Sequence, residues 1–252
     1  MYVFLGSHEL EEPTFAILGD SHGKMLAPAI NHAAEMSGKK GIFVGSGGCL
    51  ALLGVSQLRQ GFESCDERAD AFLSYLKANP NITHVILISR WAIYANSVRY
   101  KNTIGSDVYI QDKLTKVHSK DENRKVFDRS FVLTMDALNQ LNLDVTIVAQ
   151  IPESEWGASD MAFAKLIRPD LKLYINRHEY DQRQQNVSQV FSRYKNMFEY
   201  QVVYPHEKMC DMNQCKILHE GVSIYRDNNH ITRTFALTFS DFFAEVFETV
   251  NK

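Results

Sequence analysis

Short apolar runs alternate with longer amphipathic stretches along most of this chain. Five runs have the length and composition of buried β-strands: 15–18, 41–44, 84–89, 144–149 and 200–204. The stretches between and after them carry apolar residues at helical spacing over 22–37, 66–78, 121–141, 160–167, 178–197 and 233–250. Strands that alternate with helices predict a parallel sheet with helices on both of its faces.

Two stretches lack this periodicity. Residues 1–14 carry little pattern, and we expect an irregular lead-in before the first strand. Residues 92–119 hold Tyr94, Tyr100 and Tyr109 among polar residues. An insertion at the carboxyl end of a strand suits either recognition of a sugar by aromatic faces or an ordinary solvated loop.

The composition is that of an ordinary globular protein. Hydrophobic residues make up 45% of the chain, enough for one large core. Its 27 basic and 30 acidic residues give a net charge of −3 without a long run of either sign, which argues against a nucleic-acid partner. No apolar run approaches the length of a membrane span, and no signal-peptide pattern opens the chain. Without a repeat or a linker, the sequence predicts one domain over residues 1–252.

A polar turn follows the first strand. Gly19 ends the apolar run, and Asp20, Ser21 and His22 lie where the next helix begins. A serine at this place lies beside helix N-terminal amides, which stabilise negative charge, at the edge where open α/β sheets bind their ligands. Ser21 is therefore a candidate nucleophile, and we expect Asp20 to brace the turn.

A serine hydroxyl needs a base that a third group orients. Near the other end of the chain, Asp227 and His230 have a spacing that lets the carboxylate reach one imidazole nitrogen while the other faces outward. Together with Ser21 they would form a Ser-His-Asp triad. The alternative is that Asp227 starts a turn and His230 packs below the last helix. The occurrence of all three in one α/β pattern favours catalysis.

Glycines follow the second strand, in the segment Ser46-Gly47-Gly48-Cys49. Glycine lets a backbone come close to a ligand, so an N–H of Gly47 or Gly48 could bind the oxyanion of a tetrahedral intermediate. The alternative is a mobile turn.

The four cysteines form two local pairs, Cys49 with Cys65 and Cys210 with Cys215. This arrangement suits two disulfides, each clamping a loop, and so an oxidising compartment. A four-thiolate zinc site is disfavoured because neither pair has the spacing of a zinc knuckle. Reduced cytosolic thiols are the other alternative. We expect no metal and no cofactor.

Together these motifs resemble a known family. Gly19-Asp20-Ser21-His22 with Asp227-x-x-His230 resembles the first and last sequence blocks of the SGNH hydrolase superfamily. More narrowly, the chain resembles the SGNH domains fused to membrane-bound acyltransferase-3 proteins, which O-acylate bacterial cell-envelope sugars. The narrower match depends on these further features: Ser46-Gly47-Gly48-Cys49, Arg90-Trp91, the pair Cys210 and Cys215, and the segment Ile-Tyr-x-Asp-x-x-His-Ile-Thr at 224–232.

The resemblance implies a three-layer α/β/α, flavodoxin-like fold around a five-stranded parallel sheet in the order 2-1-3-4-5. It implies that Ser21 accepts an acyl group, that His230 takes the serine proton and that Asp227 holds the imidazolium. Backbone amides of Ser21 and of Gly48 or Gly47 would bind the oxyanion. The resemblance also supports both disulfides.

One position departs from the superfamily. Most members carry Gly-x-Asn-Asp after the third strand, and that asparagine donates to the oxyanion, but here the strand leads into Arg90-Trp91. Arg90, the Trp91 indole or backbone amides would replace the missing donor. Alternatively, Arg90 pairs with a surface carboxylate and Trp91 fills a wall. His22 would either touch a substrate or supply a supporting hydrogen bond.

A second loop follows the fourth strand, and Glu153, Glu155 and Trp156 are candidates to line the cleft.

The resemblance implies an O-acyltransferase, most simply an O-acetyltransferase, acting through a Ser21 acyl-enzyme on a hydroxyl of a cell-envelope polysaccharide such as lipopolysaccharide. A membrane-embedded acyltransferase region would deliver the acyl donor. The chain would then be the C-terminal part of a longer bacterial inner-membrane protein, with this domain in the periplasm. A glycan O-acetyl esterase and a catalytically silent carbohydrate-binding domain are the alternatives.

Overall fold

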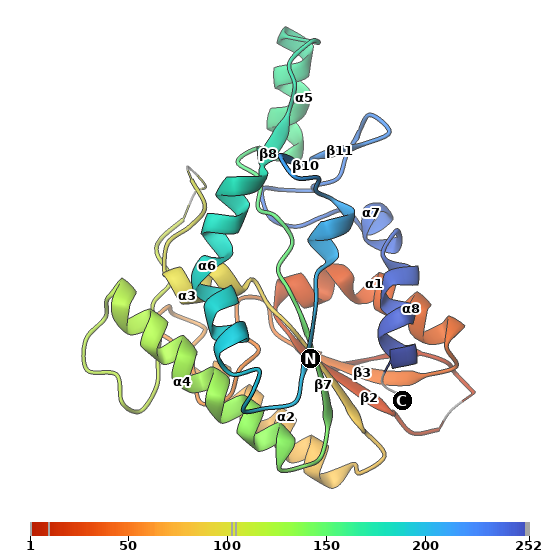
Figure 1. Ribbon diagram of the computed structural model, residues 1–252, viewed down its shortest axis with the longest axis vertical. Coiled ribbons are helices and arrows are strands. Elements are labelled where there is room, and N and C mark those ends of the chain that lie inside the picture. The colour runs from red at the N-terminus through yellow and green to blue at the C-terminus, as the bar shows by residue number, and fades with distance from the viewer. Residues whose placement is uncertain (1, 10, 102, 104, 250–252) are drawn as a thin grey trace.

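A six-stranded sheet forms the centre of the molecule in a computed structural model that describes residues 2–9, 11–101, 103 and 105–249. In spatial order its strands are β1 (Tyr2–Gly6), β3 (Lys40–Gly45), β2 (Phe15–Gly19), β5 (His84–Ile88), β7 (Asp144–Val148) and β9 (Gln201–Val203) (Figure 1). The five strands from β3 to β9 are parallel. This confirms the predicted order 2-1-3-4-5.

The sixth strand, β1, differs from the prediction. It pairs antiparallel with β3, with Tyr2 opposite Val44 and Gly6 opposite Lys40. The prediction of an irregular lead-in is therefore wrong over 2–6, while Met1 and Leu10 lie outside the described residues. Pairing satisfies backbone groups that the edge of β3 would otherwise expose. Tyr2, Val3 and Phe4 are all exposed although they are apolar. The strand therefore shows no alternation of polar and apolar residues that could predict it.

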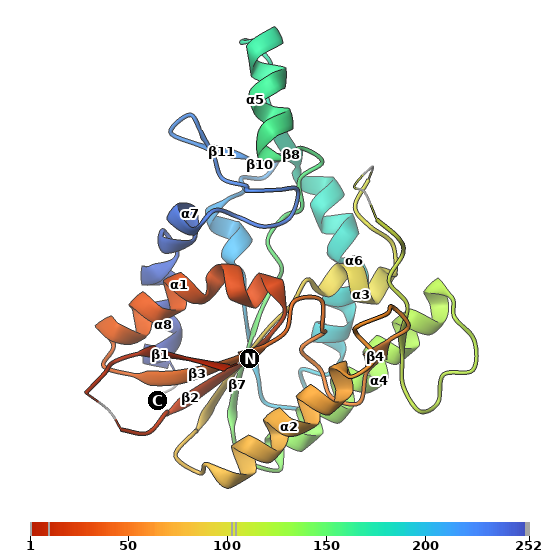
Figure 2. The same ribbon diagram turned by 180° about the vertical axis from the view of Figure 1, so that it is seen from behind.

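Helices cover both faces of the sheet (Figures 1 and 2). One layer consists of α1 (Ser21–Met36), α7 (Arg233–Leu237) and α8 (Ser240–Thr249). The other consists of α2 (Cys65–Ala78), α3 (Trp91–Asn96), α4 (Lys120–Asn139) and α6 (Arg177–Arg193). The two faces of each strand feed different cores, as Leu87 of β5 joins the α4 side and Ile86 joins the α1 side. This is why β2 and β5 are buried at every position and largely apolar.

Two predicted helices end differently in the structure. The helix expected over 233–250 is interrupted between α7 and α8, where the amides of Thr238 and Phe239 bond to carbonyls three residues back. The Thr238 hydroxyl also donates to the Phe235 carbonyl, a local bond that competes with a regular helix. Val250, the last residue of that predicted range, lies outside the described residues. The helix expected over 178–197 ends at Arg193.

The insertion after β5 is folded onto the core. It begins with α3, and later β6 (Ile110–Gln111) pairs with β4 (Ser56–Gln57), while Asn102 and Ile104 lie outside the described residues. Tyr94 and Tyr100 are buried. Their rings therefore offer no exposed face to a sugar. They do not lie in a solvated loop either.

A second group of elements lies beyond the carboxyl ends of the strands. Helix α5 (Ala158–Ile167) projects away from the body (Figure 1), next to the paired strands β8 (Tyr174–Asn176) and β10 (Gln214–Lys216). The 3₁₀ helix η1 (Pro205–Lys208) and the hairpin of β11 (Leu218–His219) and β12 (Val222–Ser223) complete this region. Both cysteine pairs form disulfides, Cys49–Cys65 and Cys210–Cys215. None of the described helices is both long and apolar enough to cross a membrane.

Candidate active site

The turn between β2 and α1 is braced by the Asp20 carboxylate, which is buried. Its Oδ1 accepts a hydrogen bond from the His22 amide over 2.7 Å and caps α1. Its Oδ2 accepts from the Arg90 amide (2.9 Å) and the Tyr94 hydroxyl (3.1 Å). Burial raises the pKa of Asp20, and these donors oppose that shift. The turn thereby holds Ser21, which is half-buried, at the first position of the helix.

The Asp227 carboxylate orients the His230 ring. Nδ1 of His230 lies 2.8 Å from Oδ2 and 3.1 Å from Oδ1 of Asp227. Oδ1 also accepts from the amides of Asn229 and His230, which close a tight turn. Partial burial alone would raise the pKa of Asp227, but these hydrogen bonds hold it well below its usual range. The contact places a proton on Nδ1 and leaves Nε2 as the basic nitrogen.

This turn docks against the first residues of α1, although the two segments lie some two hundred residues apart. Nε2 of His22 is 3.2 Å from Oδ1 of Asn229, and the rings of His22 and His230 lie 5.4 Å apart between centroids. The Ile231 amide approaches the sulfur of Met25 at 3.4 Å. Burial, with the nearby charge of Arg90, lowers the pKa of His22 to about 3, so its ring is neutral at neutral pH.

The structure thus brings the Ser21 turn and the Asp227–His230 pair into one cluster. The hydrogen bond between the Ser21 hydroxyl and His230 is not formed in this structure. Nε2 of His230 is buried and has no hydrogen-bond partner among the described residues. The cluster therefore contains the Ser21 hydroxyl and the oriented imidazole of His230, which lies beside the ring of His22 and has a basic nitrogen without a partner. This is the equipment of nucleophilic acyl transfer.

The glycine turn after β3 is held in place. Gly45 of β3 is the register partner of Gly19, so the turn leaves the sheet beside the Ser21 turn. The Gly48 carbonyl accepts from the Gln57 side chain, and the next residue, Cys49, is bonded to Cys65 of α2. These ties argue against the mobile turn considered above. Among the described residues, the amides of Ser21, Gly47 and Gly48 have no hydrogen-bond acceptor. A Cβ added at Gly47 would meet no atom within 4 Å.

Trp91 does not supply the missing oxyanion donor. Its side chain is fully buried, and the indole N–H donates to the carbonyl of Val148, the last residue of β7, over 2.8 Å. That possibility is therefore wrong, because the donor already satisfies the end of a strand.

Arg90 pairs with a carboxylate that is buried rather than exposed. Its Nε donates to Oε1 of Glu153 over 2.6 Å, while Oε2 of Glu153 accepts from Nε of Arg183 over 2.8 Å. All three side chains are at least nine-tenths buried. Burial alone would raise the pKa of Glu153, but the two guanidinium groups lower it to about 2. The alternative that Arg90 pairs with a surface carboxylate is therefore wrong, because its partner Glu153 is buried.

The remaining residues of this loop have separate roles. Glu153 is buried and does not line an open cleft. Glu155 is exposed and lies 3.3 Å from Nζ of Lys101, and Trp156 is half-buried.

Residues 152–154 connect the two halves of the cluster. The Ser154 amide donates to the Asn228 carbonyl (2.7 Å), and the Tyr225 hydroxyl donates to the Pro152 carbonyl (2.7 Å). Sequence reasoning missed Asn229, Ser154 and Arg183. The position of Asn229 between the paired aspartate and histidine was an available signal, whereas nothing local marks the other two residues.

The described residues contain no group of three or more His, Cys, Asp or Glu side chains that could hold a metal ion.

Comparisons with known proteins bear on the family and the fold of the chain. A family model described as "SGNH domain (fused to AT3 domains)" matches residues 2–245. A search of curated proteins found no matching sequence.

Several solved structures share the fold. The periplasmic domain of a lipopolysaccharide acetyltransferase from Salmonella ser. Paratyphi A has a TM-score of 0.67 and 14% identity, covering 96% of this chain and 85% of that one. A putative acylhydrolase from Bacteroides fragilis has a TM-score of 0.52 and 12% identity, covering 96% and 91%. A GDSL-like lipase from Bacteroides thetaiotaomicron has a TM-score of 0.50 and 9% identity, covering 96% and 92%. At these identities the likeness shows the fold alone.

Proposed function

The chain belongs to the family of SGNH domains fused to AT3 domains, and from that premise we propose that it is an O-acyltransferase. It moves an acyl group, most simply acetyl, through Ser21 to a hydroxyl of a bacterial cell-envelope polysaccharide. One observation carries the proposal: the Asp227–His230 pair is docked on the first turn of the helix that Ser21 begins. A merely structural turn would not need an oriented imidazole at this place.

The proposed reaction has two halves. Nε2 of His230 takes the Ser21 proton as Oγ bonds to the acyl carbon of the donor, and the imidazolium returns the proton to the departing donor group. A sugar hydroxyl then attacks the acyl-enzyme and gives its proton to Nε2, and the imidazolium returns a proton to the Ser21 oxygen as the bond from that oxygen to the acyl carbon breaks. The Asp227 carboxylate stabilises the imidazolium in both halves.

We assign the oxyanion site to backbone amides of Ser21 and Gly48, with Gly47 as the neighbouring alternative. The amides of Ser21, Gly47 and Gly48 donate to no acceptor among the described residues. Arg90 and Trp91 are committed elsewhere, to Glu153 and Val148, so they support the site rather than donate to the substrate. Backbone donors at such a site contribute most because the fold has already oriented them.

The fusion that defines the family supports transfer over hydrolysis, because an AT3 membrane region would supply the acyl donor. An esterase that deacetylates glycans remains the second candidate, since the same residues serve when water replaces the sugar. The two disulfides suit an oxidising compartment, and we place the domain in the periplasm.

The test is mass spectrometry of the protein after incubation with an activated acetyl ester. We expect one acetyl group on the peptide that contains Ser21, no adduct on that peptide in Ser21→Ala, and an unchanged adduct in Ser37→Ala, which alters the other end of α1. Adding de-O-acetylated cell-envelope polysaccharide should then yield acetylated polysaccharide. Rapid release of acetate without an acceptor would favour the esterase. Neither adduct nor product in the wild type would overturn both enzymatic proposals.

A further inference from the structure

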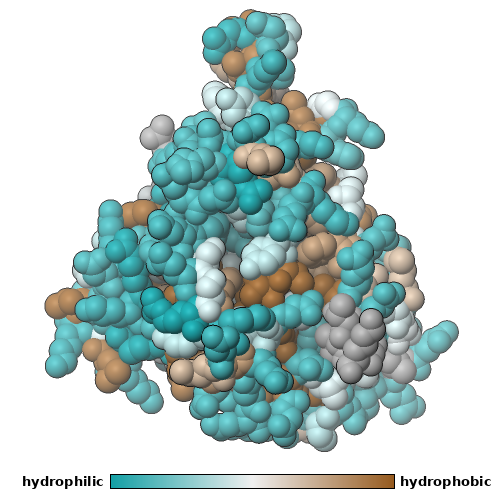
Figure 3. Space-filling model, in the orientation of Figure 1, coloured by the Kyte–Doolittle hydropathy of each residue, from teal (hydrophilic) through white to brown (hydrophobic). Residues whose placement is uncertain are grey.

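A groove opens beside α6, at the carboxyl ends of β7 and β9. It encloses about 620 Å³, within the range of about 300–1,000 Å³ that small-molecule sites occupy. Its lining includes Gln150, Tyr180, Gln184, Gln189, Tyr204 and His206. The surface over α6 is hydrophilic (Figure 3). The groove lies on the same edge of the sheet as Ser21 but is lined by different residues.

Three buried nitrogens in this lining have no hydrogen-bond partner among the described residues: Nε2 of Gln150, Nε2 of Gln184 and Nδ1 of His206. The three residues are only 3%, 7% and 6% exposed. Buried polar atoms are nearly always paired in proteins, because leaving one unpaired costs free energy. A ligand that reaches these three nitrogens would complete them.

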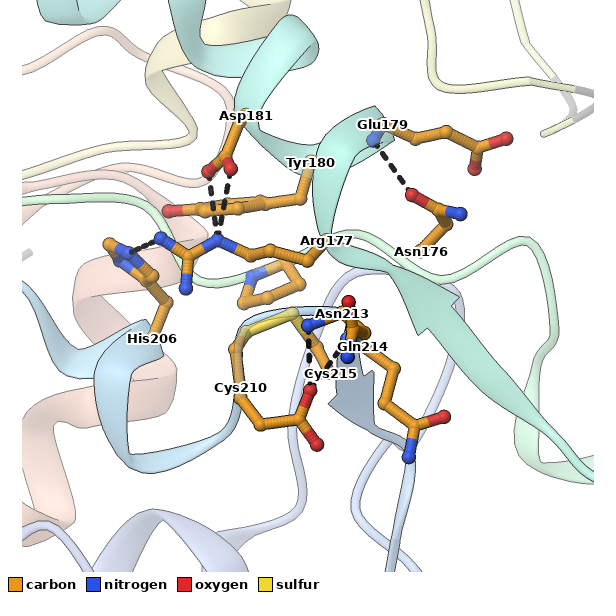
Figure 4. The surroundings of a disulfide bond; sticks show 12 residues. Asn176, Arg177, Glu179, Tyr180, Asp181, His206, Cys210, Asn213, Gln214 and Cys215 are labelled. Carbon is orange, nitrogen blue, oxygen red and sulfur yellow. Dashed lines mark hydrogen bonds and ion pairs between the residues drawn. A yellow bond between two sulfur atoms is a disulfide. The ribbon is translucent and has the colours of Figure 1, made fainter.

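All three nitrogens are hydrogen-bond donors. Oε1 of Gln150 accepts from the Ala92 amide over 2.9 Å, which sets that side chain so that its NH₂ faces the other way. Nε2 of His206 lies 3.4 Å from the guanidinium of Arg177 (Figure 4). Arginine can only donate, so Nε2 accepts and Nδ1 carries the proton. Burial, together with the Arg177 charge, lowers the pKa of His206 to about 4 and keeps the ring neutral.

Both arginines in the lining already have a carboxylate partner, and Glu207 adds an acidic side chain. Arg177 pairs with Asp181 (Figure 4), with 2.9 Å between Nε and Oδ1, and Arg193 pairs with Asp128 over 2.6 Å. The ligand is therefore rich in oxygen acceptors but carries no required negative charge. Tyr204 at the rim is 42% exposed, and its ring stands edge-on to His206 at 5.7 Å. An exposed aromatic face beside amide donors suits a sugar ring, which has an apolar face and oxygens at its edge.

We infer that this groove binds neutral sugar units of the acceptor glycan, away from the hydroxyl that is acylated. The inference rests on the proposed function in one respect, namely that the acceptor is a glycan. Gln150 follows β7 and Ser21 follows β2, and only β5 lies between these strands. At about 4.8 Å per strand the two ends are roughly 10 Å apart. A separation of this size is within the reach of a short oligosaccharide.

The test uses the Ser21→Ala protein, so that no turnover consumes the ligand. Binding is first screened on an array of short neutral and uronic-acid oligosaccharides and then measured by calorimetry with the best neutral one. Gln184→Met removes one donor, and Tyr204→Ala removes the exposed ring. The matched control is Gln182→Met on the same helix, because Gln182 is exposed and contacts His178 rather than the groove. We expect the dissociation constant to rise about tenfold or more in the first two variants and to stay unchanged in the control.

Three results would overturn the inference: no neutral oligosaccharide binds, Gln184→Met and Tyr204→Ala both bind as tightly as their parent, or acidic glycans bind best. Tyr204→Ala alters a surface side chain, so it keeps the test decisive if Gln184→Met fails to fold. Acetylation of wild-type Ser21 is measured separately. An adduct without groove-dependent binding overturns this inference alone. Groove-dependent binding without an adduct or acetylated product overturns both enzymatic proposals and leaves the groove as a glycan-binding site.

Discussion

Nε of Arg90 donates a buried hydrogen bond of 2.6 Å to Oε1 of Glu153. The same arginine donates from its backbone to Asp20, which caps the helix of Ser21. The residue after Glu153, Ser154, donates from its amide to the carbonyl of Asn228, within the turn that holds the candidate base. One buried ion pair therefore links the serine turn to the histidine turn.

Removing the charge of Glu153 should destabilise the fold strongly. Glu153→Gln leaves the buried guanidinium groups of Arg90 and Arg183 without a counter-charge, and breaking a buried pair in this way costs about 3–5 kcal/mol. Urea denaturation measures the free energy of unfolding. The control is Glu155→Gln, which breaks an exposed pair with Lys101 and should cost less than about 1 kcal/mol. Equal costs for the two variants would contradict the role given to the buried pair.

If the proposed function is right, Asp227→Asn should lower the turnover number by about 10³- to 10⁴-fold and leave the fold intact. The asparagine oxygen can still accept from the amides of Asn229 and His230, but a neutral amide cannot stabilise the imidazolium. Acetyl transfer from an activated ester gives the rate.

Asp211→Asn is the matched control for that measurement. Asp211 closes a similar turn by accepting from the amides of Asn213 and Gln214, with no histidine against its carboxylate. Its rate should equal that of the wild type. An Asp227→Asn protein that retains full activity would exclude this carboxylate from catalysis.

The two glycines after β3 should respond differently to alanine. Gly48 has a φ of +84°, and a Cβ there would overlap the ring of Phe62. Strain and overpacking together should cost about 2–4 kcal/mol of unfolding free energy in Gly48→Ala. Gly47 has open space at its Cα, so Gly47→Ala should change stability by less than about 1 kcal/mol. Thermal and urea unfolding distinguish the pair, and a larger cost at Gly47 would show that the turn has another conformation.

Stability should fall as the pH drops from neutral towards 4. His84 is buried against the Thr146 hydroxyl, and burial lowers its pKa to about 4, against 6.5 in the unfolded chain. Between these values the unfolded state binds a proton that the folded state excludes, so acid favours unfolding. At pH 5 this amounts to about 2 kcal/mol from His84 alone. The buried His22, with a pKa of about 3, acts in the same direction.

The measurement is the unfolding free energy between pH 7 and pH 5 in His84→Gln. This variant should show a shallower pH slope than the wild type, whereas replacing the exposed His32 by glutamine should leave the slope unchanged. Identical slopes in all three proteins would contradict the assignment to His84.

The sequence by itself determined the features that depend on neighbouring residues. The apolar runs predicted all five parallel strands, because a strand with helices on both faces is mostly apolar. The three-residue spacing of Asp227 and His230 predicted their contact, because a tight turn is closed by the residues within it. The cysteine pairs were close enough in sequence to indicate their own partners.

Tertiary structure alone decided which distant groups meet. Residues 2–6 form a strand because the edge of β3 offers them partners, and no pattern within those residues shows it. The Trp91 indole N–H donates to the Val148 carbonyl, and Arg90 pairs with the buried carboxylate of Glu153, 63 positions later in the chain. The groove beside α6 likewise exists only where two strand ends and a helix converge. A buried polar group needs a hydrogen-bond partner, and the folded chain decides which residue supplies it. The sequence shows which residues are polar but not which distant residue each of them contacts.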